Sequence, residues 1–298
     1  MTVESIRVSP GWLALREPAD AAARASDLVE HLGRRLPATG RPVIHDLGCG
    51  SGAMGRWLAP RLPGPQHWVV HDRDSDLLLL AAADPPGRAS DGAAVTVEAK
   101  QSDITRLQPG DLADASLITA SALLDLLTED GLAGLVKVCA GAGSPILLTL
   151  SVLGRADLTP ADPLDRRVAA AFDAHQRRTT MGGRLLGPDA VALAAEAFGR
   201  LGADVLVRPS PWRLGASQAD LTAEWFIGWV GAACEHQVEL AAETALYTPR
   251  RLAEAAAGQL AVTVGHADLL VLPDGAPSTP TSPIELLGQS VWNRGESA

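Results

Sequence analysis

A glycine-rich loop with an acidic neighbour carries the strongest chemical signal in the sequence. The segment His45-Asp-Leu-Gly-Cys-Gly-Ser-Gly52 is predicted to join the end of a buried strand to the start of a helix. Glycines in such a turn let the backbone approach a ligand closely, and the helix directs N–H groups toward that ligand. Asp46 precedes the first glycine, where its carboxylate would repel a pyrophosphate but suits a cationic ligand. The loop therefore predicts a small-molecule site.

Two further carboxylates follow the next two predicted strands. Asp72 ends the second strand, where it is placed to accept hydrogen bonds from ribose hydroxyls. Asp103 follows the third strand and is placed to accept from an exocyclic adenine amine. Each has a structural alternative, because Asp72 could cap the helix that follows it and Asp103 could be a turn residue. The three glycines could likewise mark only a tight turn.

At these residues the sequence resembles the class I S-adenosylmethionine-dependent methyltransferases. The match covers residues 42–150, with weaker agreement as far as the final strand, and Asp46-Leu-Gly-Cys-Gly-Ser-Gly52 is similar to the family's first motif. The resemblance implies S-adenosyl-L-methionine as the cofactor, with the glycine loop beside its methionine and ribose parts. It also implies that Asp72 binds the ribose and Asp103 the adenine amine, with Ile104 packed on the ring and residues 119–123 lining the methionine end.

The predicted cofactor-binding residues follow from that motif and from the segments after each strand. They are Asp46, Gly48, Cys49, Gly50, Gly52, Asp72, Arg73, Ser102, Asp103, Ile104, Ala120 and Ser121. Cys49 is expected to act through its backbone and small size rather than through its thiol. His45 and His71 lie in strands beside the carboxylates, and we expect both to be structural rather than catalytic.

The acceptor side is predicted from segments that should overhang the carboxyl edge of the sheet. His175 is the candidate general base, because a histidine titrates near neutral pH. Arg178, Trp212, Arg213 and His266 are the candidate substrate-binding residues. The structural alternative for His175 and Arg178 is that they are cations near a helix C-terminus, where the helix dipole favours them. For His266 it is a buried histidine satisfied by its neighbours.

These residues predict methyl transfer to an oxygen or nitrogen of a small-molecule acceptor by in-line displacement. The stretch after the fourth strand is Thr119-Ala-Ser-Ala rather than the Asn/Asp-Pro-Pro-Tyr/Phe that resembles amino-methylating enzymes. With 25 basic and 35 acidic residues the net charge is −10, which disfavours a nucleic-acid partner. Two alternatives stay open: a non-catalytic S-adenosylmethionine-binding protein and, less favoured, a nicotinamide-dependent oxidoreductase.

The elements that must position these residues alternate between strands and helices. This rhythm predicts an α/β fold: a doubly wound, mostly parallel seven-stranded sheet flanked by helices, with helical cap insertions after strands five and six. The expected strands are 42–46, 67–71, 94–99, 115–119, 145–150, 203–208 and 262–272. The expected helices are 18–36, 53–61, 75–83, 128–140, 163–177, 188–201, 221–240 and 249–258, the last with Thr248 as its N-cap.

The first helix is expected to be amphipathic. Its apolar stripe includes Ala21, Leu28 and Leu32, and Asp20, Arg24, Asp27 and Arg34 are expected to point outward. The chain is divided into an N-terminal helical segment over 1–41, a methyltransferase domain over 42–272 and a Pro-rich, mobile tail over 273–298. Within the domain, residues 153–187 and 214–258 form the predicted cap.

The composition limits the classes of protein to which the chain can belong. With 47% hydrophobic residues among 298, the chain can bury a full core. The longest apolar run, 77–83, is far shorter than the ~20 residues of a membrane span, and the N-terminus lacks a basic stretch followed by an apolar one. We therefore expect a cytoplasmic protein with no membrane partner. The three cysteines lack metal-ligand spacing, so no metal is expected, and the sequence does not decide between a monomer and a homodimer.

Overall fold

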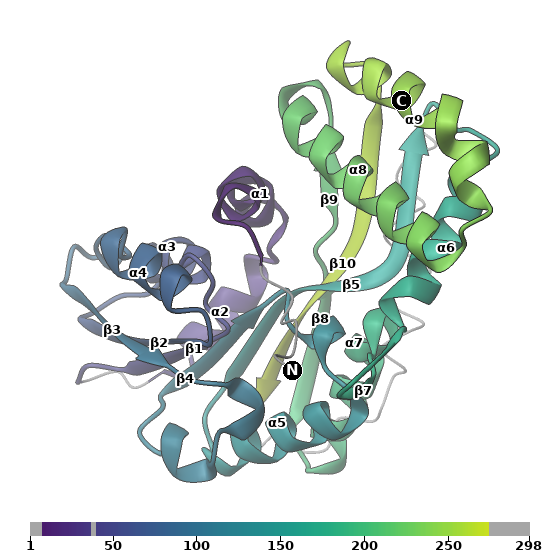
Figure 1. The fold of residues 1–298 in the computed structure, drawn as a ribbon. Coiled ribbons are helices and arrows are strands. Elements are labelled where there is room, and N and C mark those ends of the chain that lie inside the picture. Colours follow the sequence, from purple (N-terminus) through teal and green to yellow (C-terminus); the bar gives the residue numbers. More distant parts are fainter. Residues whose placement is uncertain (1–7, 37–39, 274–298) are drawn as a thin grey trace.

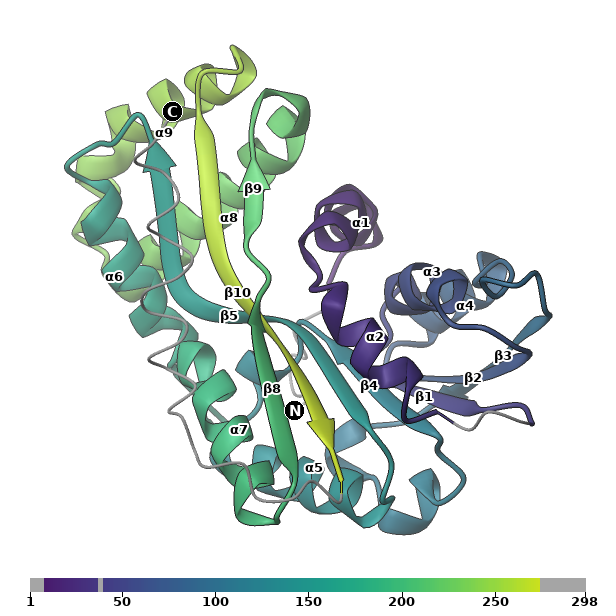
Figure 2. The same ribbon diagram turned by 180° about the vertical axis from the view of Figure 1, so that it is seen from behind.

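One long, twisted sheet runs through the molecule (Figures 1 and 2). The computed structural model describes residues 8–36 and 40–273. The strand order is β3-β2-β1-β4-β5-β10-β8, with β9 added on β10. The first five strands of this order are parallel, and β10 runs antiparallel to β5, β8 and β9. The predicted doubly wound, mostly parallel sheet is confirmed.

The bounds of the elements follow. The strands are β1 (Val43–Leu47), β2 (Gln66–Asp72), β3 (Val95–Gln101), β4 (Leu117–Ser121), β5 (Ile146–Thr159), β6 (Thr179–Thr180), β7 (Gly183–Arg184), β8 (Asp204–Pro209), β9 (Trp212–Leu214) and β10 (Ala261–Leu272). The helices are α1 (Pro10–Ala23), α2 (Asp27–Gly33), α3 (Ala53–Leu58), α4 (Ser75–Ala83), α5 (Glu129–Gly141), α6 (Asp165–Gln176), α7 (Ala190–Arg200), α8 (Ala219–His236) and α9 (Leu240–Ala256).

Helices cover both faces of the parallel part of the sheet. One core lies between the strands and α2, α3 and α4, and a second core lies between the strands and α5 and α7. Because successive side chains of a strand point to opposite faces, Ile44 and Asp46 face the first core while His45 and Leu47 face the second. Helix α4 has the predicted bounds, and Thr128 caps α5 as predicted by accepting from the Gly131 N–H at 3.1 Å.

The prediction of one amphipathic helix over 18–36 is wrong. The chain forms α1 and α2 with a break between them, where Arg24 has an extended ψ of 136°. Its neighbour Ala25 donates its N–H to Asp268 Oδ2 at 2.8 Å instead of continuing the helix. Asp20 and Arg24, expected to point outward, are 5% and 4% exposed. Both are buried because β9, β10 and the strand ends provide polar partners that the sequence pattern does not reveal.

The fifth strand is also longer than predicted. It was expected to end at residue 150, but β5 continues to Thr159 and pairs with β10 along its whole extension. With β9 it forms an antiparallel sheet that extends beyond the parallel strands, and α6, α8 and α9 cover it (Figure 1). The cap expected over 153–187 and 214–258 therefore has a strand framework as well as helices. Residue 150 has a φ of 57°, which marks the bend.

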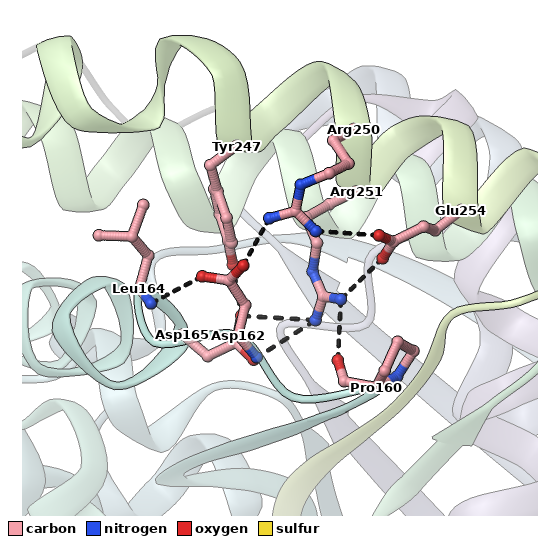
Figure 3. A network of polar contacts seen from close by, with 8 residues as sticks. All are labelled: Pro160, Asp162, Leu164, Asp165, Tyr247, Arg250, Arg251 and Glu254. Carbon is pink, nitrogen blue, oxygen red and sulfur yellow. Dashed lines mark hydrogen bonds and ion pairs between the residues drawn. The ribbon is translucent and has the colours of Figure 1, made fainter.

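A buried ion-pair network joins α9 to the segment that leads into α6 (Figure 3). The Arg251 guanidinium donates to Pro160 O at 2.8 Å and Glu254 Oε2 at 2.7 Å, and it lies 3.4 Å from both Asp165 oxygens. The Tyr247 hydroxyl donates to Asp165 Oδ1 at 2.7 Å. These contacts hold the far end of the cap together. Helix α9, which carries Arg251 and Tyr247, begins at residue 240. The prediction that a helix starts at Thr248 and Pro249 is therefore wrong, because both residues lie inside α9.

Residues 1–7 and 37–39 of the predicted N-terminal segment, and the predicted tail from 274 onward, lie outside the described residues. Within the described ranges, no helix combines the length and the apolar character that a membrane crossing requires.

Candidate functional site

The glycine loop has the backbone that its composition predicted. Gly48, Gly50 and Gly52 have φ angles of 66°, 54° and 87°, a region that side chains disfavour. A Cβ on Gly48 would lie 3.2 Å from Leu123 Cδ1, and one on Gly50 would lie 3.3 Å from Leu13 Cδ1. The loop is therefore a close-approach turn, and two apolar side chains lie directly over it.

Asp72 organises this loop from the neighbouring strand. Its Oδ2 accepts from the Gly50 N–H at 2.9 Å, and its Oδ1 accepts from the Asp74 N–H at 2.9 Å. The Cys49 N–H donates to His71 O at 2.9 Å, so the loop is also joined to the end of β2 by backbone. The carboxylate is held in one orientation and keeps further lone pairs, because each carboxylate oxygen can accept more than one hydrogen bond.

Asp46 lies below the loop and is 1% exposed. Its Oδ1 accepts from Thr119 Oγ1 at 2.7 Å, while its Oδ2 is buried with no hydrogen-bond partner among the described residues. Burial raises the pKa of this carboxyl to about 7, although the Thr119 hydrogen bond and the Arg24 charge act in the opposite direction. Burying such an oxygen costs free energy unless a ligand or a water molecule donates a hydrogen bond to it.

The third predicted carboxylate is more exposed. Asp103 has 44% of its side chain exposed and accepts from the Thr105 N–H at 3.0 Å and from Thr105 Oγ1 at 2.7 Å. Partial burial works against ionisation, but the hydrogen bonds from Thr105 lower the pKa of Asp103 overall. Ile104 is half-buried against the core of α5, and Arg73 is exposed beside Asp72. Asp103 and Asp72 follow neighbouring strands, so they lie at the same sheet edge.

The remaining predicted residues lie beside the loop or one strand away. Ala120 is buried and Ser121 half-buried at the end of β4, next to β1. Burial raises the pKa of the Cys49 thiol, so this buried residue stays a neutral thiol in the loop.

A buried arginine that we predicted to be on the surface lies at the same strand ends. The Arg24 guanidinium donates to Ser121 Oγ at 3.2 Å and to Thr149 Oγ1 at 3.4 Å, and it lies over Trp57, 5.3 Å from the ring centroid. Its Nη1 is buried without a partner among the described residues. Burial lowers the pKa of Arg24, while Asp20, Asp268 and Asp46 act in the opposite direction. Helical periodicity could not find it, because the helix breaks at this residue.

On the other face of β1 and β2, two histidines form a complete hydrogen-bonded chain. His45 Nε2 lies 3.0 Å from Asp114 Oδ1, His45 Nδ1 lies 2.9 Å from His71 Nε2, and His71 Nδ1 lies 3.0 Å from Ser102 Oγ. Burial lowers the pKa of His45, and it lowers that of His71 to about 4. With both rings neutral, each nitrogen has one partner. Ser102, a predicted cofactor-binding residue, therefore has its hydroxyl group at the end of this series of hydrogen bonds.

Helix α1 lies between the glycine loop and the cap (Figures 1 and 2). On the loop side, Glu17 accepts from Arg56 at 2.6 and 2.7 Å. On the cap side, the rings of Trp12 and Trp212 lie 6.2 Å apart, and Asp20 Oδ1 accepts from Trp212 Nε1 at 2.9 Å. The helix therefore contacts both regions.

The predicted acceptor residues fall into separate places. Trp212 is buried with His266 at a ring distance of 5.2 Å, and His266 Nδ1 is buried without a partner among the described residues. Burial lowers the pKa of His266 to about 3. Arg213 is exposed between buried neighbours on β9, so it points away from Trp212.

His175 and Arg178 are half-buried at the end of α6, where Arg178 Nη1 donates to His175 O at 3.2 Å. Burial lowers the pKa of His175, and Arg178 contributes in the same direction.

One further carboxyl group was missed. Asp125 lies in the short 3-10 turn Leu124–Leu126 that follows β4. Burial raises its pKa, while the charges of Arg16 and Arg178 lower it. The sequence signal that could have found Asp125 is its position soon after the fourth strand. Asp46, Asp72 and Asp103 occupy the corresponding positions at the ends of the first three strands.

The structure is a doubly wound α/β fold in which the glycine loop and the carboxylates at 46, 72 and 103 lie at the carboxyl ends of parallel strands. No family model matches the sequence, and no curated protein matches it.

The structure is similar over most of its length to several solved structures. A cyclopropane-fatty-acyl-phospholipid synthase-like protein from Lactobacillus casei is 15% identical with a TM-score of 0.48, covering 91% of this chain and 96% of that one. A SAM-dependent methyltransferase from Geobacter sulfurreducens, in complex with S-adenosyl-L-homocysteine, is 17% identical with a TM-score of 0.42, covering 89% and 98%. A geranyl diphosphate methyltransferase in complex with SAM is 11% identical with a TM-score of 0.42, covering 91% and 96%. Likeness at this level assigns no activity to the chain.

Proposed function

We propose that the protein is an S-adenosylmethionine-dependent methyltransferase that acts on an oxygen or nitrogen of a small-molecule acceptor. One observation carries the proposal: a positive-φ glycine loop follows β1 with Asp46 buried beneath it, and Asp72 holds that loop from the end of β2. Asp103 follows β3 at the same edge. A ligand that suits this order of groups has a cationic part at Asp46, a diol at Asp72 and an amine near Asp103.

The residues present fit this cofactor. The unpartnered Asp46 Oδ2 leaves an acceptor for a positive group beside the loop. Asp72 keeps free lone pairs toward the site, although both its oxygens already accept from the backbone. Leu13 and Leu123 lie over the glycines and supply apolar contact that excludes water. When bound, the cofactor would supply a methyl group on a sulfonium sulfur, and the neutral thioether left after transfer is a good leaving group.

The chain's own contribution is alignment, since holding two reactants in line can supply about 7–11 kcal/mol of the barrier reduction. We place the acceptor between α1 and the segments after β4 and β5. In this region His266 Nδ1 has no hydrogen-bond partner among the described residues. The positive charges of Arg16 and Arg178 both lower the pKa of Asp125. Asp125 and His175 are the groups that would take a proton from an acidic acceptor. Arg178, whose charge acts on both Asp125 and His175, would position the acceptor. Trp212 is buried against α1 and Arg213 is exposed, so neither is placed with it. The net charge of −10 supports a small molecule over a nucleic acid.

Binding of S-adenosylhomocysteine to the purified chain, measured by calorimetry, tests the cofactor. We expect saturable one-site binding, no comparable binding of NAD, and clear weakening in the Asp72→Ala variant. Methyl transfer from labelled cofactor to a panel of carboxylated, hydroxylated and amine-bearing metabolites, with RNA and DNA included, tests the acceptor class. Binding of NAD in preference to S-adenosylhomocysteine would contradict the cofactor, and labelling of nucleic acid alone would contradict the acceptor class.

A further inference from the structure

A cleft lies in the cap between helices α6 and α8, over the extended part of strands β5 and β10 (Figure 1). Its volume is about 310 Å³, part of which is open to solvent. Its floor is formed by backbone and small side chains of the two strands, including Gly154 and Gly265. None of the residues assigned above to the cofactor or to the acceptor lines this cleft. It is therefore a separate feature of the cap.

Aromatic rings form the walls of the cleft. Trp225 and Trp229, one turn apart on α8, stack with their ring centroids 5.2 Å apart, and Phe172 of α6 also lines the cleft. Trp229 is buried, whereas Trp225 and Phe172 are half-buried. The face of an aromatic ring attracts organic cations as well as apolar groups. The walls therefore suit an apolar molecule, including one that carries a positive charge.

Two polar residues of α6 also line the cleft, and both offer hydrogen-bond acceptors. Gln176 Oε1 is buried and has no hydrogen-bond partner among the described residues. Asp173 is three residues earlier, on the same face of the helix, and burial raises the pKa of its carboxyl to about 6. Gly154 lets the β5 backbone approach this carboxylate, because a Cβ there would lie 2.9 Å from Asp173 Oδ2. The two acceptors call for a ligand that donates hydrogen bonds.

Two arginines beside the cleft are engaged by other carboxylates. Arg177 donates to both oxygens of Asp189 at 2.7 Å. Arg155, which lines the cleft, donates to Asp157 Oδ2 at 2.9 Å. The Arg177 charge lowers the pKa of Asp173, but the guanidinium is directed at Asp189. Within residues 8–36 and 40–273, the Asp173 carboxylate has no cation in direct contact with it.

We propose that this cleft binds an apolar amine in its protonated form. The ammonium group has three donors for the Asp173 carboxylate and Gln176 Oε1, and the apolar part of the molecule contacts the aromatic walls. An anion would be repelled by Asp173, and a purely apolar molecule would leave Gln176 Oε1 without a partner. The ligand is distinct from the cofactor and from the methyl acceptor, so this inference does not depend on the proposed function.

The test compares two probes of the same shape. 2-Phenylethylamine is protonated at neutral pH, and 2-phenylethanol is its neutral counterpart. Calorimetry on the full chain should show that the amine binds at least about 10-fold more tightly, because its donors meet a charged acceptor. In Asp173→Asn the affinity for the amine should fall at least about 10-fold, while that for the alcohol should stay within about 3-fold. Asp130→Asn, the same change at an exposed position on α5, is the matched control and should alter neither affinity.

Further variants separate this cleft from the acceptor region. Trp225→Leu should weaken both probes, because it removes an aromatic wall that does not depend on charge. Asp125→Asn should leave the binding of the amine unchanged. Loss of amine binding in Asp125→Asn, with Asp173→Asn behaving as wild type, would move the amine to the acceptor region and overturn the proposal.

Two results with the wild-type chain would also overturn the proposal. One is equal affinity for the amine and the alcohol, and the other is no binding of the amine at all. Both would leave the proposed methyl transfer intact, because that function is tested with S-adenosylhomocysteine and labelled cofactor. If Asp173→Asn does not fold, as judged by circular dichroism, Gln176→Leu gives the same comparison, because it removes the second acceptor.

Discussion

Two arginines of this chain are almost completely buried, and their surroundings differ. Arg251, in the cap, is 1% exposed, and its two terminal nitrogens contact Asp165, Glu254 and a carbonyl oxygen (Figure 3). Arg24, at the strand ends, is 4% exposed; its guanidinium donates to two hydroxyls at 3.2 and 3.4 Å and lies over Trp57. Among the described residues, the first charge is neutralised by direct ion pairs, whereas the second has no direct ion pair. The first arrangement is expected to contribute more to stability than the second.

The same contrast separates two neighbouring residues of β1. His45 belongs to the chain of hydrogen bonds from Asp114 to Ser102, in which every ring nitrogen has a partner. Asp46, the next residue, points to the other face and keeps one oxygen without a partner among the described residues. Completed polar networks need not bind anything. Incomplete ones in a buried position are where a ligand is expected.

The largest expected effect is on stability in the cap. Arg251→Met should lower the free energy of unfolding by about 3–5 kcal/mol, because it leaves Asp165 buried without its cation. Arg24→Met should change that free energy in the ligand-free chain by less than about 1 kcal/mol, since no direct ion pair is lost. Urea denaturation measures both. Equal destabilisation by the two substitutions would remove the contrast between the arginines.

The next largest effect is expected on the affinity for the cofactor product. Asp72→Ala should weaken S-adenosylhomocysteine by about 1.5–3 kcal/mol, the contribution of a hydrogen bond to a charged acceptor. The loop also loses the carboxylate that accepts from the Gly50 N–H, which adds to the loss. Calorimetry measures the affinity. Asp91→Ala, at an exposed turn, is the matched control, and unchanged affinity in Asp72→Ala would contradict the site.

The histidine chain predicts a pH dependence of stability. The pKa of His71 is lowered to about 4 in the folded state, so the unfolded chain binds more protons below its ordinary pKa near 6.5. The free energy of unfolding should therefore fall as pH decreases from 6.5 toward 4, by up to about 3 kcal/mol for this residue. His45 and His266 act in the same direction because their pKa values are also lowered. Asp46 acts oppositely, since its pKa is raised to about 7.

His71→Gln keeps a donor and an acceptor but does not titrate, so it should flatten this slope. Denaturation at several pH values measures the change, with His31→Gln, outside the chain of hydrogen bonds, as the control. A slope that His71→Gln leaves intact would show that other groups cause it.

The smallest effect concerns the helix between the two regions. Glu17→Gln removes a partly exposed ion pair with Arg56 and should cost about 0.2–1 kcal/mol, less at high salt. Because this pair joins α1 to the helix that follows the glycine loop, the same variant should also bind S-adenosylhomocysteine more weakly than wild type, and the difference should shrink at high salt. Stability and affinity that do not respond to salt would contradict a role for this pair.

The alternation of short apolar strands with amphipathic helices was enough to predict the sheet and most of its helices, because that pattern is local. The glycine loop and the carboxylates at 46, 72 and 103 were predictable for the same reason, since parallel strands bring consecutive ends to one edge. Only the tertiary structure placed Arg24 inside, because a partner 243 residues away holds the break between α1 and α2. It also decided that β5 continues past residue 150, since that extension exists only where β10 pairs with it. The same holds for Asp125 and for Asp46 Oδ2, which has no partner within residues 8–36 and 40–273: burial and the availability of partners are properties of the packed chain, and no spacing of residues encodes them.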